Sequence, residues 1–422
     1  MGMTITEKIL ADHANVAKVV PGELVIVKVD GVLTNDISGP IAINEFKKMG
    51  TGKVFDKEKI FMLLDHFTPN ANQQAAKQCK YCRDFAKDQE IKHFYDVGRV
   101  GIEHAFLPEN GLVSPGQIIV GGDSHTCTYG ALGIFSTGIG STDVAAAMSL
   151  GEIWLKVPES MEFIYTGQLQ PFVSGKDLIL YTIGQIGVSG ALYKTMEFCG
   201  EIIENLSLDS RFTMCNMAIE AGAKNGIMKP NDKVRDYMKK RNVSNLPLKY
   251  YESDRDAKYI EAIEYDVNSI EPQVALPNSP GNTKAVSECG TVTLDQVVIG
   301  GCTNGRIEDL RIAANLLRGK KVHPYVRTII IPATNEIYKQ AMNEGLIEIF
   351  INAGAAVSTP TCGPCFGGHM GCLTDGEKAL STTNRNFLGR MGSLMSEVYL
   401  SNPAVAAASA VKGCITHPQE VI

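Results

Sequence analysis

The segment QVVIGGCTNGR, which runs from Gln296 to Arg306, joins an apolar run to a helical pattern. Its apolar start predicts a buried strand, and the glycines that follow predict a tight turn. Apolar side chains then recur at three- and four-residue steps from Ile307 to Leu317, which predicts a helix. Strand, turn and helix in this order are typical of α/β folds. Cys302 therefore lies in a turn where the first backbone N–H groups of a helix stabilise a thiolate.

Three further apolar runs predict buried strands: Leu24–Val27, Gln117–Val120 and Thr328–Ile331. Their alternation with helical patterns predicts an α/β fold with largely parallel sheets. The length of 422 residues predicts two or three domains, and turn-forming residues are concentrated between Pro272 and Gly290. We expect three units, 1–157, 158–285 and 286–422.

The composition limits the classes of function. Apolar stretches fall well short of the ~18–20 residues that cross a bilayer, so we expect no transmembrane helix. The net charge is −6, which disfavours nucleic acid or anionic lipid as a partner. Eleven cysteines, an odd number, and a start without a basic and then apolar leader predict a reduced, cytoplasmic protein.

Cys362 and Cys365 form a Cys-x-x-Cys in a turn rich in glycine and proline. A redox dithiol, half of a zinc site, part of an iron–sulfur site and an inert pair all fit this spacing. Together with Cys302 they give three ligands without an obvious fourth, which disfavours a closed zinc site and suits a cluster with one open metal position. A second pair, Cys79 and Cys82, is predicted to be structural and to lie on an ordinary exposed helix.

Acidic and imidazole side chains are adjacent at three places: Asp65-His66, Glu103-His104 and Asp123-Ser124-His125. A histidine oriented by a carboxylate is the usual proton donor or acceptor near neutral pH. The sequence alone leaves open which carboxylate faces which ring. Arg385 and Arg390, five positions apart, either hold the two carboxylates of a small diacid or are surface arginines.

Four motifs in the same order, within Gly122–Tyr129, Cys302–Arg306, Thr361–Gly368 and Thr383–Arg390, resemble the aconitase family. The resemblance covers essentially the whole chain. It implies three α/β domains around a central iron–sulfur site, without the swivel domain of full aconitases. It also implies a [4Fe–4S] cluster, one per chain, whose fourth iron binds substrate oxygens as a Lewis acid. The cluster ligands that it implies are Cys302, Cys362 and Cys365.

The same resemblance gives roles to acid and base residues. His66, held by Asp65, would protonate a departing hydroxyl. His104 would pair with Asp123, and His125 with Glu197. The substrate-binding residues that the resemblance implies are Ser124, Asn384, Arg385, Arg390 and, as a weaker match, Asn35.

The implied activity is that of a hydro-lyase, the large subunit of an enzyme that isomerises 2- and 3-isopropylmalate in leucine biosynthesis. 2,3-Dimethylmalate and homocitrate are alternative substrates. We expect the chain to need a small subunit that supplies the swivel domain. A zinc or disulfide redox protein and an RNA-binding regulator are the competing classes, and the acidic pI of about 5.8 argues against RNA. Gly301 replaces the serine expected before the cluster cysteine.

Overall fold

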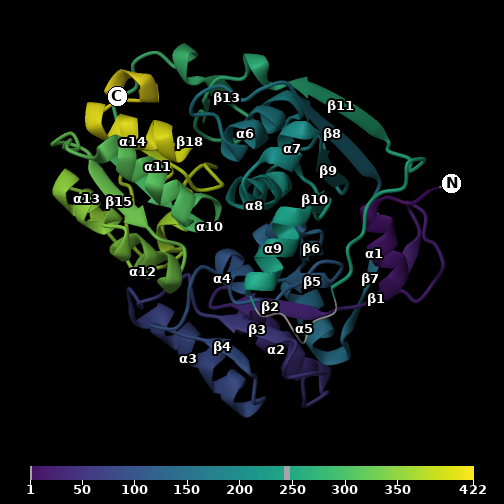
Figure 1. Cartoon of the computed structure of the whole chain (residues 1–422). Coiled ribbons are helices and arrows are strands. Elements are labelled where there is room, and N and C mark those ends of the chain that lie inside the picture. Colours follow the sequence, from purple (N-terminus) through teal and green to yellow (C-terminus); the bar gives the residue numbers. More distant parts are fainter. Residues whose placement is uncertain (1, 242–247) are drawn as a thin grey trace.

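The computed structural model describes residues 2–241 and 248–422. It contains three sheets rich in parallel strands and one two-stranded ribbon (Figure 1). The α/β class with largely parallel sheets is therefore confirmed. Among the described residues, no helix is long and apolar enough to cross a membrane.

A five-stranded, all-parallel sheet lies at the bottom of Figure 1. Its strands in spatial order are β4 (His93–Tyr95), β3 (Ile60–Leu63), β2 (Gly31–Asn35), β5 (Ile118–Gly121) and β6 (Phe135–Gly138). The helical segments of this part are α2 (Gly39–Met49), α3 (Gln73–Asp88), α4 (Glu103–Glu109), the 3-10 helix η1 (Ser124–Leu132) and α5 (Ser141–Leu150).

The second sheet has four parallel strands and lies at the upper right of Figure 1. Its strands in spatial order are β10 (Asn225–Met228), β9 (Thr195–Cys199), β8 (Ser160–Thr166) and β11 (Glu261–Asp266). The helical segments around it are α6 (Gly175–Ile186), α7 (Glu201–Asn205), α8 (Leu208–Asn216), η2 (Met217–Ala221) and α9 (Asp232–Lys240).

The third sheet has seven strands and is parallel except where β12 pairs antiparallel with β13 and with β18. The spatial order is β13 (Thr283–Ala285), β12 (Gln273–Ala275), β18 (Glu397–Ser401), β17 (Lys378–Ser381), β14 (Gln296–Gly300), β15 (Arg327–Ile331) and β16 (Ala356–Val357). Its helical segments are α10 (Gly301–Asn304), α11 (Ile307–Leu317), α12 (Asn335–Asn343), α13 (Leu346–Ala353), η5 (Gly363–Phe366) and α14 (Pro403–Lys412).

The opening segment folds as predicted, because β14 ends at Gly300 and α11 spans Ile307–Leu317. The run Leu24–Val27 does form a strand, but the prediction that this strand is buried was wrong. β1 (Leu24–Lys28) pairs antiparallel with β7 (Glu152–Lys156), and Leu24 and Ile26 are exposed. An uninterrupted apolar run cannot show that one face of a strand is turned outward.

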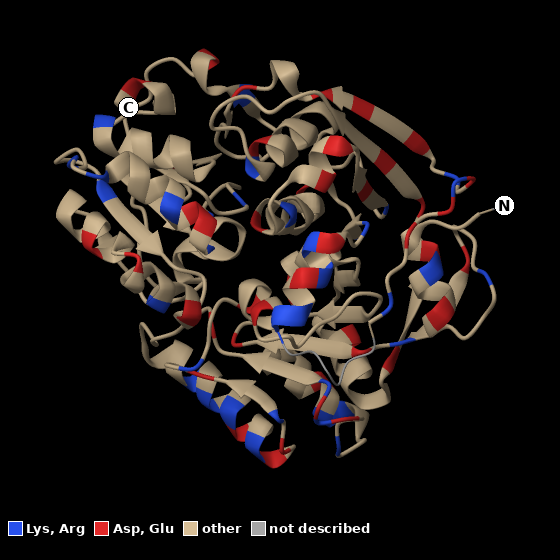
Figure 2. Ribbon diagram, in the orientation of Figure 1, with Lys and Arg blue, Asp and Glu red and all other residues tan. Residues whose placement is uncertain are grey.

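The three large sheets share one hydrophobic core. It includes Leu33 of β2, Phe163 of β8 and Ile299 of β14. The seven-stranded sheet begins at Gln273, upstream of the expected boundary after residue 285, and the division into three domains stays a prediction. Figure 2 shows charges of both signs spread over the ribbon, for example along α3.

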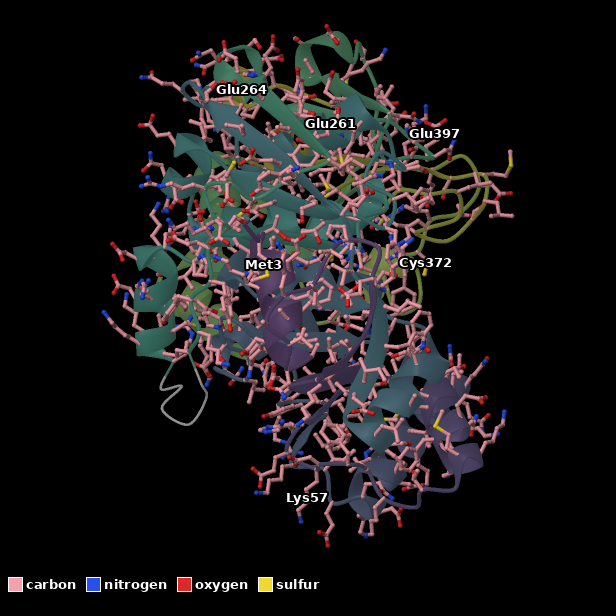
Figure 3. The ribbon with its side chains drawn as sticks, turned by 90° about the vertical axis from the view of Figure 1, so that its right-hand side faces the viewer. Met3, Lys57, Glu261, Glu264, Cys372 and Glu397 are labelled. Atoms are coloured by element: carbon pink, nitrogen blue, oxygen red, sulfur yellow. The ribbon has the colours of Figure 1, made fainter. Side chains whose placement is uncertain are left out.

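Cys79 and Cys82 do lie on a helix, α3, but on its inward face, where both are buried. The expectation of an exposed position was wrong, because the charged neighbours Lys80 and Arg83 belong to the outward face. In contrast, Cys372 is exposed at the edge of the molecule (Figure 3).

Candidate active site

A cavity of about 300 Å³ brings most of the predicted site residues together. Two groups of side chains face each other across it, cysteines and arginines from the seven-stranded sheet and acid/base residues from the five-stranded sheet. Its polar and sulfur-bearing lining consists of Asp65, His66, Glu103, His104, Asp123, His125, Cys302, Cys362, Cys365, Asn384, Arg385 and Arg390, and its apolar lining of Ile37, Ile102 and Phe366.

The site is built at the carboxyl ends of parallel strands, where α/β sheets bind their ligands. Asp65 and His66 follow β3, and Asp123 follows β5 and caps η1. Cys302 follows β14, and Asn384 follows β17. Backbone contacts join the two halves, since the N–H of Cys362 donates to the carbonyl of Asp65 over 2.9 Å.

His66 is held by two carboxylates. Its Nδ1 lies 2.7 Å from Asp65 Oδ1 and 3.6 Å from Asp36 Oδ1, and Asp36 also accepts the backbone N–H groups of His66 and Phe67. Burial alone would lower the pKa of His66, but the charges and hydrogen bonds of Asp65 and Asp36 outweigh it and raise this pKa well above its ordinary value. The two carboxylates therefore favour the protonated form of His66.

His104 and Asp123 form the second pair, as predicted. His104 Nε2 lies 2.8 Å from Asp123 Oδ1, and its Nδ1 lies 3.2 Å from the hydroxyl of Tyr129. Burial lowers the pKa of His104 despite the carboxylate. Asp123 also accepts the backbone N–H of His125, and its hydrogen bonds from the two histidines overcome burial and hold its pKa well below the usual range. The pair thus joins a neutral imidazole to an ionised carboxylate.

The predicted pairing of His125 with Glu197 was wrong. His125 Nε2 lies 2.9 Å from Glu220 Oε1, whereas Glu197 accepts hydrogen bonds from Ser253 and Tyr259 outside the cavity. Burial raises the pKa of Glu197 to about 7. Glu220 lies in η2, 95 residues from His125, and no motif surrounds it. The pairing with Glu197 is one that the family resemblance implies, whereas only the tertiary structure brings Glu220 to His125.

The three cysteines are reduced and lie around one end of the cavity. Three thiolates on a single zinc ion would hold their sulfur atoms about 3.8 Å apart. The groups of three possible ligand atoms that lie within 4.8 Å of one another in the described residues include Asp36, Asp65 and His66, but the cysteines form no such group. Cys362 and Cys365 are close enough to hydrogen-bond, but the three sulfur atoms do not all lie within 4.8 Å of one another, which disfavours one ion held by all three. A polynuclear cluster, in which each cysteine binds a different iron, does not require such an arrangement.

The surroundings of the sulfur atoms also suit a cluster. Cys302 Sγ accepts hydrogen bonds from the side-chain amides of Asn216 and Asn384, each over 3.3 Å, and Cys365 Sγ accepts one from Arg390 Nη2 over 3.3 Å. Donors to sulfur stabilise thiolates and tune clusters. Burial raises the pKa of Cys302 to about 12, so ionisation of this thiol requires a cation. The residues present therefore fit a [4Fe–4S] cluster.

The glycine in place of serine at position 301 has a backbone reason. Gly301 has φ +89°, in the region that favours glycine. A Cβ there would lie 3.4 Å from Thr383 Cγ2, so the strain of a serine would come from the backbone and not from crowding.

The remaining predicted residues divide into two groups. Asn384, Arg385 and Arg390 line the cavity, whereas Ser124 and Asn35 are not among its lining residues. Asn35 is 2% exposed, and its amide donates to Glu103 Oε1 over 3.1 Å. Its side-chain oxygen accepts the N–H of Ser38. Asn35 thus holds neighbouring residues in place.

Comparison with known proteins agrees with this geometry. The model of the aconitase family (aconitate hydratase) matches residues 7–293 and 282–413, and the chain belongs to that family. Its similarity to 3-isopropylmalate dehydratase large subunits extends over the full length. Identity is 62% over 421 residues with the protein of Syntrophus aciditrophicus and 60% over 422 residues with that of Halothermothrix orenii, with 100% of both chains covered in each case.

A third large subunit matches in sequence, and a solved structure matches in fold. The 3-isopropylmalate dehydratase large subunit 1 of Pyrococcus furiosus is 60% identical over 423 residues, which cover 100% of this chain and 99% of that one. The crystal structure of Thermococcus kodakaraensis aconitase X in its holo-form matches with a TM-score of 0.52 at 12% identity. It covers 90% of this chain and 88% of that chain, and at this identity the match concerns the fold alone.

Proposed function

We propose that this chain is the cluster-binding large subunit of a 3-isopropylmalate dehydratase, which interconverts 2- and 3-isopropylmalate by dehydration and rehydration. The observation that carries the proposal is one cavity in which three cysteines and two arginines face carboxylate-held histidines, in a chain 60–62% identical to such subunits. The lining suits a diacid with an apolar branch, because Ile37, Ile102 and Phe366 line it beside Arg385 and Arg390.

Cys302, Cys362 and Cys365 would hold a [4Fe–4S] cluster. When bound, such a cluster with an open iron position supplies a Lewis acid for substrate oxygens. Arg390 Nε has no hydrogen-bond partner among the described residues, although this atom is buried. That free donor suits a substrate carboxylate.

The acid/base residues would divide the proton transfers. His66 keeps Nδ1 on Asp65, which leaves Nε2 to protonate the departing hydroxyl. Removal of a proton next to a carboxylate and loss of hydroxide need such an acid as well as charge stabilisation. Arg385 is oriented by Glu220 and would bind one substrate carboxylate, and Arg390 the other.

The chain would act with a small subunit that supplies the swivel domain, in an enzyme of three large-subunit domains, 1–157, 158–285 and 286–422. The relatives named above are themselves called large subunits. We therefore expect no dehydration by the chain alone. Activity of the purified chain without a partner would contradict this part of the proposal.

The test is anaerobic co-expression with the small subunit, followed by rates on isopropylmalate, 2,3-dimethylmalate and homocitrate measured side by side. We expect a clear preference for isopropylmalate. Preference for either alternative would assign the chain to a different dehydratase of the family. Iron and acid-labile sulfide are measured on the same sample, because zinc without sulfide would overturn the cluster and with it the mechanism.

A further inference from the structure

Glu103 is a buried carboxyl group in the active-site cavity that has no role in the mechanism above. It begins α4, is 1% exposed and lines the cavity. Its Oε1 accepts a hydrogen bond from Asn35 Nδ2, and its backbone N–H donates to Asp65 Oδ2 over 2.8 Å. Its second oxygen, Oε2, is buried without a hydrogen-bond partner among the described residues. Glu103 lines the cavity, and an unpartnered buried oxygen on a lining residue points to a ligand.

The surroundings of Glu103 indicate where that ligand atom would lie. Ligand atoms of His66, Glu103 and Asp123 all lie within 4.8 Å of one another, and His104 Nε2 lies 3.4 Å from Glu103 Oε1. The carboxyl group of Glu103 thus lies close to His66, Asp123 and His104. In the proposed reaction, this is the neighbourhood of the hydroxyl group that leaves and returns.

The surroundings of Glu103 favour its protonated, neutral form. Burial, together with the nearby carboxylates of Asp65 and Asp123, raises the pKa of Glu103 well above its ordinary value. A neutral carboxyl group can donate a hydrogen bond, which an ionised one cannot. The oxygen without a partner can therefore donate a hydrogen bond to a substrate oxygen. A neutral carboxyl group also does not repel the carboxylates of the substrate.

We propose that Glu103 is a substrate-contacting residue whose neutral carboxyl donates a hydrogen bond to the oxygen that leaves as water and returns during isomerisation. This inference rests on the proposed function. In the dehydration step the C–H proton goes to a base of the assembled enzyme and the electron pair forms the C=C bond. The C–O bond breaks, and His66 protonates the leaving oxygen. Glu103 keeps its own proton, and no bond to it forms or breaks.

The consequence concerns the outcome of the reaction. A water molecule held at Glu103 after C–O cleavage stays beside the alkene and adds to the neighbouring carbon. Without this donor the water escapes more easily, and more of the free unsaturated acid is released. Glu103 would thus favour isomerisation over simple dehydration.

The test compares Glu103→Gln, which keeps a donor, with Glu103→Met and Glu103→Ala, which do not. Each is assayed in the holoenzyme with its small subunit. We expect the Met and Ala variants to lose roughly tenfold in kcat/KM for isopropylmalate, the loss of about one hydrogen bond, and to release more unsaturated acid per isomer formed. Glu103→Gln should stay within about threefold of wild type, with an unchanged pH profile.

Glu109 provides a matched control on the same helix. It is partly buried, and one of its carboxylate oxygens also has no hydrogen-bond partner among the described residues, but it lies against Thr334, outside the active-site cavity. Glu109→Met should keep the wild-type ratio of unsaturated acid to isomer. Iron, sulfide and the visible spectrum of each variant are measured alongside the rates.

Three results would overturn the inference. Met and Ala variants with wild-type rates and product ratio would show that Oε2 contacts no reacting atom. A Gln variant as impaired as the Met variant would show that Glu103 transfers its proton. Loss of iron from both the Met and the Ala variant would assign Glu103 to the fold. A wild-type holoenzyme that turns over none of the three hydroxy acids would instead defeat the proposed function.

Discussion

Glu220 Oε1 accepts a hydrogen bond from Arg385 Nε over 2.7 Å, across 165 residues of sequence. The same oxygen lies 2.9 Å from His125 Nε2. Burial would raise the pKa of Glu220, but these two partners lower it below the usual value, so the carboxylate is ionised. One buried charge from the middle of the chain thus holds a histidine and an arginine of the cavity together.

Glu220→Gln should impair both partners at once. The amide keeps one acceptor, loses the charge and brings an NH₂ group toward a donor, so kcat should fall and KM should rise. We expect kcat/KM to drop at least roughly a hundredfold, as for the loss of one partner of a buried charge pair. Steady-state kinetics of the holoenzyme measure this. Glu344→Gln, which breaks the surface ion pair with Arg311, is the control and should leave kinetics unchanged.

Replacing Cys302, Cys362 or Cys365 by serine should remove most of the iron and acid-labile sulfide. A hydroxyl is a much poorer iron ligand than a thiolate, and each cysteine holds one iron of the proposed cluster. Cys372→Ser is the matched control, because Cys372 is exposed and belongs to the same loop region (Figure 3). Full iron content in Cys302→Ser would contradict the assigned ligands.

Prolonged aeration of wild type should abolish activity, since an open iron position exposes the cluster.

The pH dependence of activity should reflect the pKa of His66, which the carboxylates of Asp65 and Asp36 raise. Their effect keeps the acid form present above the ordinary pKa of 6.5, so activity should decline only at alkaline pH. Asp36→Asn removes one carboxylate and should move this alkaline limb to lower pH. His66 also contributes stability below pH 6.5, which is lost as the pH rises through its folded pKa. Asp30→Asn, which removes the partner of His13 far from the cavity, should leave the activity profile in place.

Glu197→Gln distinguishes the two pairings considered for His125. The folded-state pKa of Glu197 is about 7 against an ordinary 4.5, so the native state binds the extra proton. Wild-type stability should therefore fall by up to about 3 kcal/mol as the pH rises from 4.5 to 7. Urea unfolding at several pH values should show a smaller decline in Glu197→Gln. Turnover should be unchanged, and a large loss of activity would restore Glu197 as the partner of His125.

Local patterns were enough for much of the fold and part of the site. The strand at Gln296–Gly300 and the helix at Ile307–Leu317 follow from periodicity, and Asp65 with His66 are adjacent in sequence. Contacts between distant segments left no such signal. Glu220 lies in η2 without a motif. The sequence marks Glu103 only as the neighbour of His104, and the fold shows that its Oε2 has no hydrogen-bond partner among the described residues. Periodicity also could not show that Leu24 and Ile26 face outward.

The side-chain amide of Asn216 donates to Cys302 Sγ, and four residues further along the chain Glu220 receives His125. Both come from the α8–η2 segment, which belongs to neither of the two halves of the site described above. In a chimera that exchanged this segment with a distant relative, the hydrogen-bond donor to Cys302 Sγ and the partner of His125 would be inherited as one block. Recombination between members of the family is therefore constrained at a segment that contributes neither a cluster ligand nor an arginine to the cavity.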